Sequence, residues 1–184
     1  MGSARRHPNV VNVDELETRE SVHGRRFASS RKQLGAASGG RGIGCSWFEV
    51  PPGRTAFPRH FHCANEEALF VLEGEGTLHL GDATVEVRPG DYATLPVGPA
   101  HAHVLINRGP SPLRYICFST MLPTDLVGYP DSKKVLALAT PALVRDERDG
   151  EPWIRLIVPA ASGLAFYDGE DTDPNAETAE GRRR

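Results

Sequence analysis

Short runs of alternating apolar and polar residues dominate the middle of the chain. Alternation with a period of two predicts β-strands that bury one face and expose the other. The expected strands are Ile43 to Val50, His60 to His62, Ala68 to Glu73, Gly76 to Leu80, Thr84 to Arg88, Tyr92 to Pro96, His103 to Asn107 and Leu113 to Thr120. Helical periodicity is scarce, so the sequence predicts an all-β domain.

Residues typical of turns separate these runs. The turns are expected at Pro51-Pro52-Gly53, Gly81-Asp82, Pro89-Gly90-Asp91 and Arg108-Gly109-Pro110. About eight short strands at this spacing favour a barrel or jelly roll, because a closed sheet leaves few free edges.

Composition narrows the class of protein further. The 184 residues carry a net charge of −3 and include 19 glycines and 15 prolines, which fits one turn-rich domain with tails. No basic face indicates nucleic acid, and no apolar stretch reaches the length of a membrane span. Cys45, Cys63 and Cys117 form no CxxC pair, so we expect reduced thiols and a cytoplasmic location.

Two histidine pairs have the spacing of a strand face. His60 and His62 are one residue apart, so both imidazoles leave a strand on the same side. Residues 64–66 can form a short turn, after which Glu67 shares a face with Leu69. Two imidazoles and a carboxylate in one cavity suit a divalent ion such as iron, manganese, zinc or nickel.

A second pair, His101 and His103, offers candidates for a fourth ligand. It follows the glycine and proline turns at residues 90–99 and again has strand spacing. Two such pairs, the first of them followed by a glutamate, favour a metal site more strongly than one pair does.

In these segments the chain resembles the cupins, a family of double-stranded β-helix barrels that includes the bacterial type-2 cupins. The first family motif is matched by Gly53, His60-Phe61-His62, Glu67 and Gly74, with one extra residue before His60. Counting six residues back from Gly74 selects Glu67 rather than Glu66. The resemblance covers residues 43–120 well and the remainder weakly.

The second family motif is matched by Gly90, Pro96, Gly98, a histidine and Asn107. The three-residue gap before Asn107 selects His103, whereas the shorter gap after Gly98 selects His101. We prefer His103, because residues 102–107 (AHVLIN) are similar to the corresponding segment of close cupin relatives. His101 remains the alternative fourth ligand.

The resemblance implies a single cupin domain, a jelly-roll barrel with short N- and C-terminal extensions. We expect an N-terminal arm and leading strands at residues 1–42 and the core at 43–120. An extension that packs on the barrel should follow at 121–168, with a disordered tail at 169–184. Cupins commonly pair, so the resemblance also implies a homodimer.

Three imidazoles and one glutamate leave about two positions open on a six-coordinate ion, for water, dioxygen or a chelating substrate. We therefore predict a metal-dependent enzyme that acts on a small oxygenated molecule. Dioxygenase, decarboxylase and sugar or sugar-phosphate isomerase chemistry all occur in similar cupins. The alternative is a metal-containing binding or sensing module without turnover. No organic cofactor is expected, and the sequence assigns no catalytic residue.

Further candidates concern the substrate cavity. Its possible wall residues are Trp47, Phe48, Leu69, Val71, Tyr92 and Phe118. An anionic substrate could pair with Arg59 or Arg114.

Overall fold

A computed structural model describes residues 7–140 and 152–170 of the chain. Its strands are β1 (Arg19–His23), β2 (Phe27–Gln33), β3 (Ile43–Val50), β4 (Phe61–His62), β5 (Glu67–Glu73), β6 (Gly76–Leu80), β7 (Ala83–Val87), β8 (Tyr92–Leu95), β9 (His103–Ile106), β10 (Leu113–Thr120), β11 (Thr124–Tyr129), β12 (Lys134–Ala139) and β13 (Ile154–Pro159). The helical elements within these ranges are short: η1 (Val13–Glu15), α1 (Leu34–Ala37) and η2 (Pro99–His101). No helix in the described ranges is long and apolar enough to cross a membrane.

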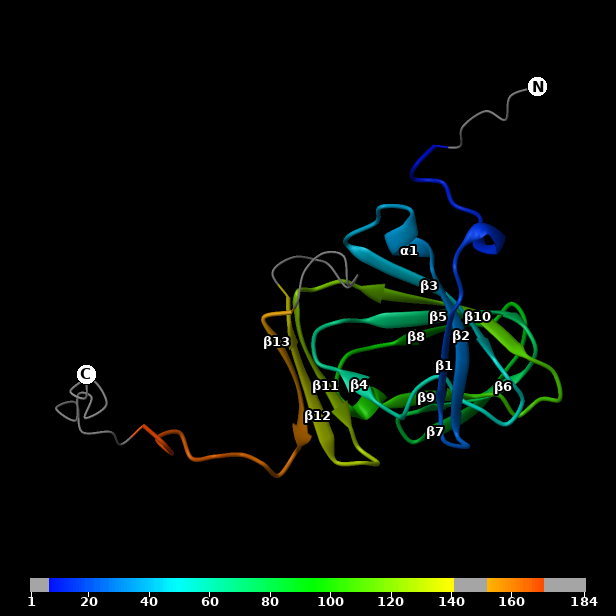
Figure 1. Ribbon diagram of the computed structural model, residues 1–184. Coiled ribbons are helices and arrows are strands. Elements are labelled where there is room, and N and C mark those ends of the chain that lie inside the picture. The colour runs from blue at the N-terminus through cyan, green and yellow to red at the C-terminus, as the bar shows by residue number, and fades with distance from the viewer. Residues whose placement is uncertain (1–6, 141–151, 171–184) are drawn as a thin grey trace, which may run out of the picture.

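Three antiparallel sheets surround a common interior (Figure 1). The largest has the strand order β1-β2-β3-β10-β5-β8, and the other two have the orders β7-β6-β9 and β13-β12-β11-β4. Strand β10 is central, because it pairs with β3 along its whole length on one side and with β5 on the other. The predicted all-β jelly-roll fold is confirmed.

The alternation that predicts the strands also decides which side chains form the core. Along β5, Leu69 and Val71 are 3% and 0% exposed, whereas Phe70 and Leu72 are 37% and 38% exposed. The core gathers such inward residues from seven strands: Phe48, Val50, Leu69, Val71, Leu78, Val87, Leu95, Leu105, Leu113 and Tyr115. Burial of these apolar side chains, which come from the largest sheet and from the sheet of β7, β6 and β9, stabilises the barrel.

Glycine is required where the end of β5 approaches β10. Gly74 has a φ of 78°, in the left-handed region that favours glycine. A Cβ at this position would lie 2.9 Å from the Cα of Leu113 and would collide with the carbonyl oxygen of Pro112. The motif glycine therefore allows the chain to turn tightly against its neighbour.

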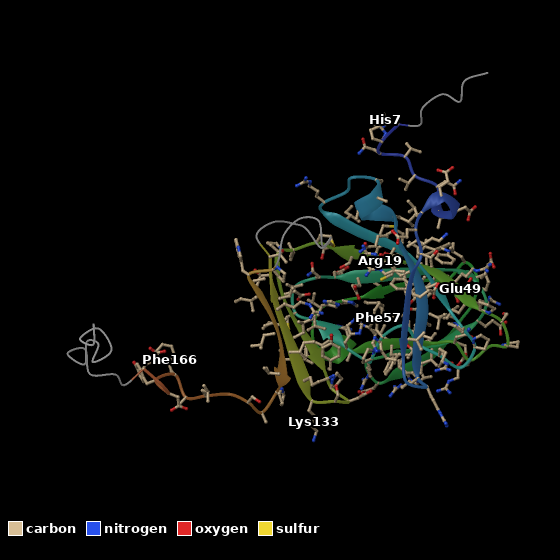
Figure 2. All side chains as sticks on the ribbon, in the orientation of Figure 1. His7, Arg19, Glu49, Phe57, Lys133 and Phe166 are labelled. Carbon is tan, nitrogen blue, oxygen red and sulfur yellow. The ribbon has the colours of Figure 1, made fainter. Side chains whose placement is uncertain are left out.

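The segment after the core contributes strands of its own. β11 pairs with β4, with Val127 opposite His62 and Gly128 opposite Phe61. A Cβ on Gly128 would collide with the Phe61 ring, so this glycine leaves room for the ring against β11. Beyond β13 the described chain extends away from the barrel, and Phe166 is 87% exposed (Figure 2).

The helical turn α1 and the strands β1 and β2 precede the cupin core. The single helical turn α1 (Leu34–Ala37) follows β2 directly and begins the glycine-rich segment before β3. Strands β1 and β2 lie before the recognisable core and extend the largest sheet. Of the tail expected at 169–184, residues 171–184 lie outside the described residues.

Candidate metal centre

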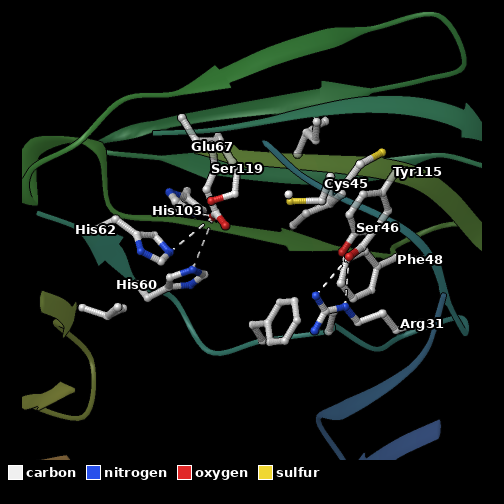
Figure 3. A pocket seen from close by; sticks show the side chains of 18 of the residues that line it. Arg31, Cys45, Ser46, Phe48, His60, His62, Glu67, His103, Tyr115 and Ser119 are labelled. Atoms are coloured by element: carbon white, nitrogen blue, oxygen red, sulfur yellow. Dashed lines mark hydrogen bonds and ion pairs between the residues drawn. The ribbon is translucent and has the colours of Figure 1, made fainter. Parts of the chain in front are cut away.

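Three histidines and one glutamate meet at one end of the barrel interior (Figure 3). His62 lies on β4, Glu67 begins β5 and His103 begins β9. His60 precedes β4 and forms a β-bridge with His103, through backbone bonds of 3.0 and 2.7 Å. Since directly opposed residues of an antiparallel pair place their side chains together, this bridge brings two imidazoles side by side, with ring centroids 4.6 Å apart.

All three imidazoles turn their Nε2 atoms toward the same carboxylate oxygen. The distances from Glu67 Oε2 are 3.8 Å to His60, 3.5 Å to His62 and 3.4 Å to His103. Ligand atoms of His60, His62 and Glu67 lie within 4.8 Å of one another, so these three residues could hold a metal ion. His103 is not part of that closest triplet and joins it through Glu67.

The Nδ1 atom of each of the three imidazoles lies within hydrogen-bond distance of an acceptor oxygen. His60 Nδ1 lies 2.9 Å from the carbonyl of Pro58, and His103 Nδ1 lies 3.0 Å from the carbonyl of His101. His62 Nδ1 lies 2.6 Å from Oδ2 of Asp125. A carbonyl or carboxylate oxygen can only accept, so each Nδ1 carries a proton and donates it. In the neutral rings the Nε2 atoms then present lone pairs to the interior.

Charge at the centre is concentrated on buried groups. Burial by itself raises the pKa of Glu67, but the neighbouring imidazoles, His103 first, hold that pKa well below its usual value. Burial lowers the pKa of His62, yet the hydrogen bonds to Asp125 and Glu67 outweigh it and raise the pKa to about 9. Without an ion, a proton on His62 supplies part of the positive charge that the two carboxylates attract.

The donor set fits a divalent cation. Lone pairs on several nitrogens face an anionic oxygen, and the Nε2 atom of His103 is buried without a hydrogen-bond partner. The separations of 3.4 to 3.8 Å exceed those of charge-assisted hydrogen bonds, about 2.7–2.9 Å. Two ligand atoms sharing an ion at about 2.1 Å would be roughly 3.0–3.4 Å apart. The separations between the three Nε2 atoms and the Glu67 oxygen are thus slightly wider than those in a filled site.

The two candidates for the fourth ligand lie in different positions. His103 is 5% exposed, lines the cavity and points at Glu67. His101 ends the short helix η2, and its contact with the centre is made by its backbone carbonyl, which accepts from His103. The side chain of His101 does not line the cavity.

A cavity of about 680 Å³ extends from the centre into the barrel. Phe48 and Leu69, two of the expected wall residues, line it, and Phe57 and Tyr115 line it as well. The expectation is wrong for Tyr92. This residue is 61% exposed, because it occupies a position on β8 whose side chain points outward. Trp47 and Phe118 also do not line the cavity, and Val71 is a core residue.

The arginines that line the cavity, Arg31 and Arg41, are not the expected pair. Arg59 donates to the carbonyl of Gly81 and lies 3.7 Å from Asp131. Arg114 is paired with two glutamates on the outer face of the sheet. Arg31 of β2 lines the cavity instead and donates to Oγ of Ser46 at 3.0 and 3.1 Å.

Figure 3 places Arg31, Ser46, Phe48 and Tyr115 at the opposite end of the cavity from the histidines. Sequence reasoning misses Arg31 because β2 lies outside the recognisable motifs. A cationic residue in an alternating segment is by itself an ordinary surface pattern.

Sequence reasoning also misses Asp125, which contacts the candidate ligand His62. It lies on β11 and is 2% exposed. Its alternation phase is shared with Val127 and Tyr129, which both line the cavity. An acidic residue on an apolar strand face is a usable signal, but the sequence does not say which partner compensates its charge.

The segment of the chain that forms most of the barrel is similar to known proteins. The family model "Cupin domain" matches residues 46–119. An uncharacterized protein of Methanocaldococcus jannaschii is 37% identical over 60 residues. That match covers 33% of this chain and 46% of the relative, so the chain matches less than half of the relative's length.

Two solved structures share the fold over most of both chains. One is provisionally named a sugar phosphate isomerase, from Acidithiobacillus ferrooxidans, with a TM-score of 0.71 and 27% identity over 86% of this chain and 97% of that one. The other is a sugar phosphate isomerase from a cupin superfamily, from Silicibacter pomeroyi, with a TM-score of 0.70 and 23% identity over 86% of this chain and 98% of that one. At that identity the second likeness concerns the fold alone. The family model and the shared fold show that residues 46–119 form a cupin domain.

Proposed function

We propose that this cupin is a metal-dependent enzyme that converts a small oxygenated molecule inside the barrel. His60, His62, Glu67 and His103 would hold the ion. The observation that carries the proposal is the set of three Nε2 atoms aimed at one buried carboxylate, with every Nδ1 atom already engaged. A buried carboxylate surrounded by imidazole nitrogens needs positive charge among them, which a bound cation would supply.

The ligand chemistry favours a borderline first-row ion. Imidazole and carboxylate together suit iron, manganese, zinc or nickel, and the cell's supply often decides among these. A bound ion of this kind would polarise an oxygen of the substrate as a Lewis acid. Four protein ligands on a six-coordinate ion leave room for a substrate that offers one or two oxygens.

The remaining cavity residues would position the substrate. Apolar side chains such as Phe48, Phe57 and Leu69 exclude water and pack against carbon atoms. Arg31 and Ser46 offer hydrogen-bond donors at the far end, where a polar or anionic group of the substrate would lie. We expect the molecule to combine chelating oxygens at one end with such a group at the other.

Likeness to named structures suggests which reactions to test first. The Acidithiobacillus protein with a TM-score of 0.71 supports an isomerase of sugar phosphates. A polyketide cyclase from Streptomyces resistomycificus is 26% identical, with a TM-score of 0.50, and supports chemistry on a larger oxygenated carbon skeleton. Dioxygenase and decarboxylase reactions complete the set that the ligand chemistry allows.

The test begins with elemental analysis of the purified protein. The metal-loaded protein is then incubated with sugar phosphates, keto acids and catechols while product formation and oxygen uptake are followed. We expect turnover that is lost on chelation, restored by the ion and abolished in His62→Ala. Metal uptake with saturable ligand binding and no product would overturn the enzyme and favour a binding or sensing module. Failure to take up any first-row ion would refute the metal centre itself.

A further inference from the structure

A buried carboxylate from outside the matched cupin core contacts the proposed centre. Asp125 lies on β11, beyond the segment that matches the family, residues 46–119. Its side chain is 0% exposed, and its two carboxylate oxygens accept three hydrogen bonds. A buried charge of this kind is costly unless it is fully compensated.

Compensation comes from three donors on the segment that carries the histidines. Oδ2 of Asp125 accepts from His62 Nδ1 at 2.6 Å and from Asn65 Nδ2 at 2.9 Å. Oδ1 accepts from the backbone N–H of Ala64 at 3.0 Å. The shortest of the three bonds is the one to the imidazole, as expected for a charge-assisted bond.

Further hydrogen bonds hold β11 against the segment that carries His62. Asn65 is 0% exposed, and its Oδ1 accepts from the backbone N–H of Leu122 at 2.7 Å. Leu126 accepts from the N–H of Cys63 at 2.9 Å, which continues the pairing of β11 with β4. Asp125 is therefore held on both sides and has little freedom to turn away from His62.

We propose that Asp125 is a positioning residue of the metal centre, and this role rests on the metal-dependent function proposed above. Its carboxylate fixes the proton of His62 on Nδ1 and so directs the Nε2 lone pair at the ion. It also makes His62 a stronger electron donor than His60 and His103, whose Nδ1 atoms face neutral carbonyls. The extension beyond the cupin core thus becomes part of the site.

Asp125→Asn separates this role from a purely structural one. The amide keeps the size of the side chain, and its oxygen can still accept from Ala64. In that orientation its NH₂ group faces His62 Nδ1, which moves the ring proton to Nε2, where it blocks ligation. We expect Co²⁺ affinity, measured by competition with a chelating dye, to fall about 10–100-fold. The visible spectrum of bound Co²⁺ should change, and Asp125→Glu should restore part of the affinity.

Asn107→Ala is the matched control. Asn107 is also 0% exposed, and both ends of its side chain are hydrogen-bonded, to Val50, Ser111 and Gly109, none of which is a candidate ligand. This variant should lower the melting temperature and leave both the Co²⁺ affinity and the spectrum unchanged. If Asp125→Asn behaves like Asn107→Ala, the positioning role is refuted while the metal centre stands. If the wild-type protein binds no Co²⁺, the centre and this role both fall.

A measurement on the wild-type protein covers the case in which the Asp125 variants do not fold. In the Zn²⁺-loaded protein, ¹⁵N–¹H spectra of the histidine rings, assigned with His62→Gln, should contain a strongly downfield Nδ1 proton from His62. The Nε2 atom of His62 should carry no proton. A His62 ring protonated on Nε2 in the loaded protein would overturn the proposal.

Discussion

The three histidines of the centre are identical in chemistry but are oriented by different means. His60 and His103 each direct Nδ1 at the carbonyl of the residue two positions earlier, Pro58 and His101. Their orientation is therefore encoded locally, in the extended backbone that precedes each ring. His62 depends on Asp125, which is 63 residues away in the chain. A substitution of Asp125 should therefore disturb the orientation of His62 and leave those of His60 and His103 unchanged.

The identity of the fourth ligand gives a direct prediction at this scale. His103→Ala should lose most of the bound metal, because its Nε2 atom faces Glu67 at 3.4 Å. His101→Ala should keep it, since the cavity is not lined by the His101 side chain. Metal content per chain after dialysis measures both. Retention by His103→Ala together with loss by His101→Ala would reverse the assignment.

The cysteines allow a test of burial that does not involve metal. Cys63 is exposed, whereas Cys45 and Cys117 line the cavity and are only partly accessible. Burial, followed by the nearby Glu67 carboxylate, raises the pKa of the Cys117 thiol well above its usual value. Since the thiolate is the reactive form, iodoacetamide at pH 8 should alkylate Cys63 much faster than Cys117. Peptide mass spectrometry at successive times measures this order, and equal rates would contradict the burial of Cys117.

At the scale of elements, the centre depends on how strand ends meet. Glu67 is the first residue of β5 and pairs with Leu95 on one side and Ser119 on the other. The other end of β5 turns at Gly74 against the start of β10. A disturbance of this turn is therefore expected to weaken the sheet that carries Glu67.

Substitution of two glycines with similar φ angles distinguishes the cost of backbone strain from the cost of a steric collision. Gly74 and Gly53 have φ values of 78° and 72°, but a Cβ on Gly53 would have no atom within 4 Å. Gly53→Ala should cost about 1–2 kcal/mol for the left-handed conformation alone. Gly74→Ala should cost clearly more, because the backbone at Pro112 and Leu113 must also shift. Urea unfolding of both variants measures the difference, and equal losses would mean that the turn relaxes freely.

At the scale of the whole molecule, the centre ties the sheets together. His62 belongs to the sheet of β4 and β11, Glu67 to the largest sheet and His103 to the sheet of β6 and β9. An ion bound by all of them would link the three sheets and should stabilise the folded barrel, because the unfolded chain offers no preformed site.

Metal removal should therefore lower the melting temperature. Binding at 100 times the dissociation constant adds about 2.7 kcal/mol. For a chain of this size that corresponds to roughly 5–10 °C. Calorimetry with and without a chelator measures the shift, with Glu67→Gln as the control that should not respond to chelation. An equal melting temperature in both conditions would mean that no ion contributes to the fold.

The homodimer remains a prediction, and the outer strand β13 supports it. Ile154, Leu156 and Ile157 are each about half exposed, which is an unusual concentration of large apolar groups on an edge strand. Light scattering should give a mass near twice 20.0 kDa. Leu156→Lys should reduce that mass, whereas Val85→Lys on β7 should not, although Val85 is 47% exposed and Leu156 53%. A monomeric wild-type protein would contradict the prediction.

The sequence by itself determined the strand pattern, the barrel class and the candidate ligands. Alternation predicts β3, β6 and β10 with the bounds that the structure has, since a strand that buries one face must repeat every second residue. The spacing of His60, His62 and Glu67 likewise follows from local geometry. Only the tertiary structure decided how His103 faces Glu67, which arginines line the cavity, and that Asp125 supports His62. Those relations join residues far apart in the chain, and pairing between strands, rather than any local pattern, brings them together.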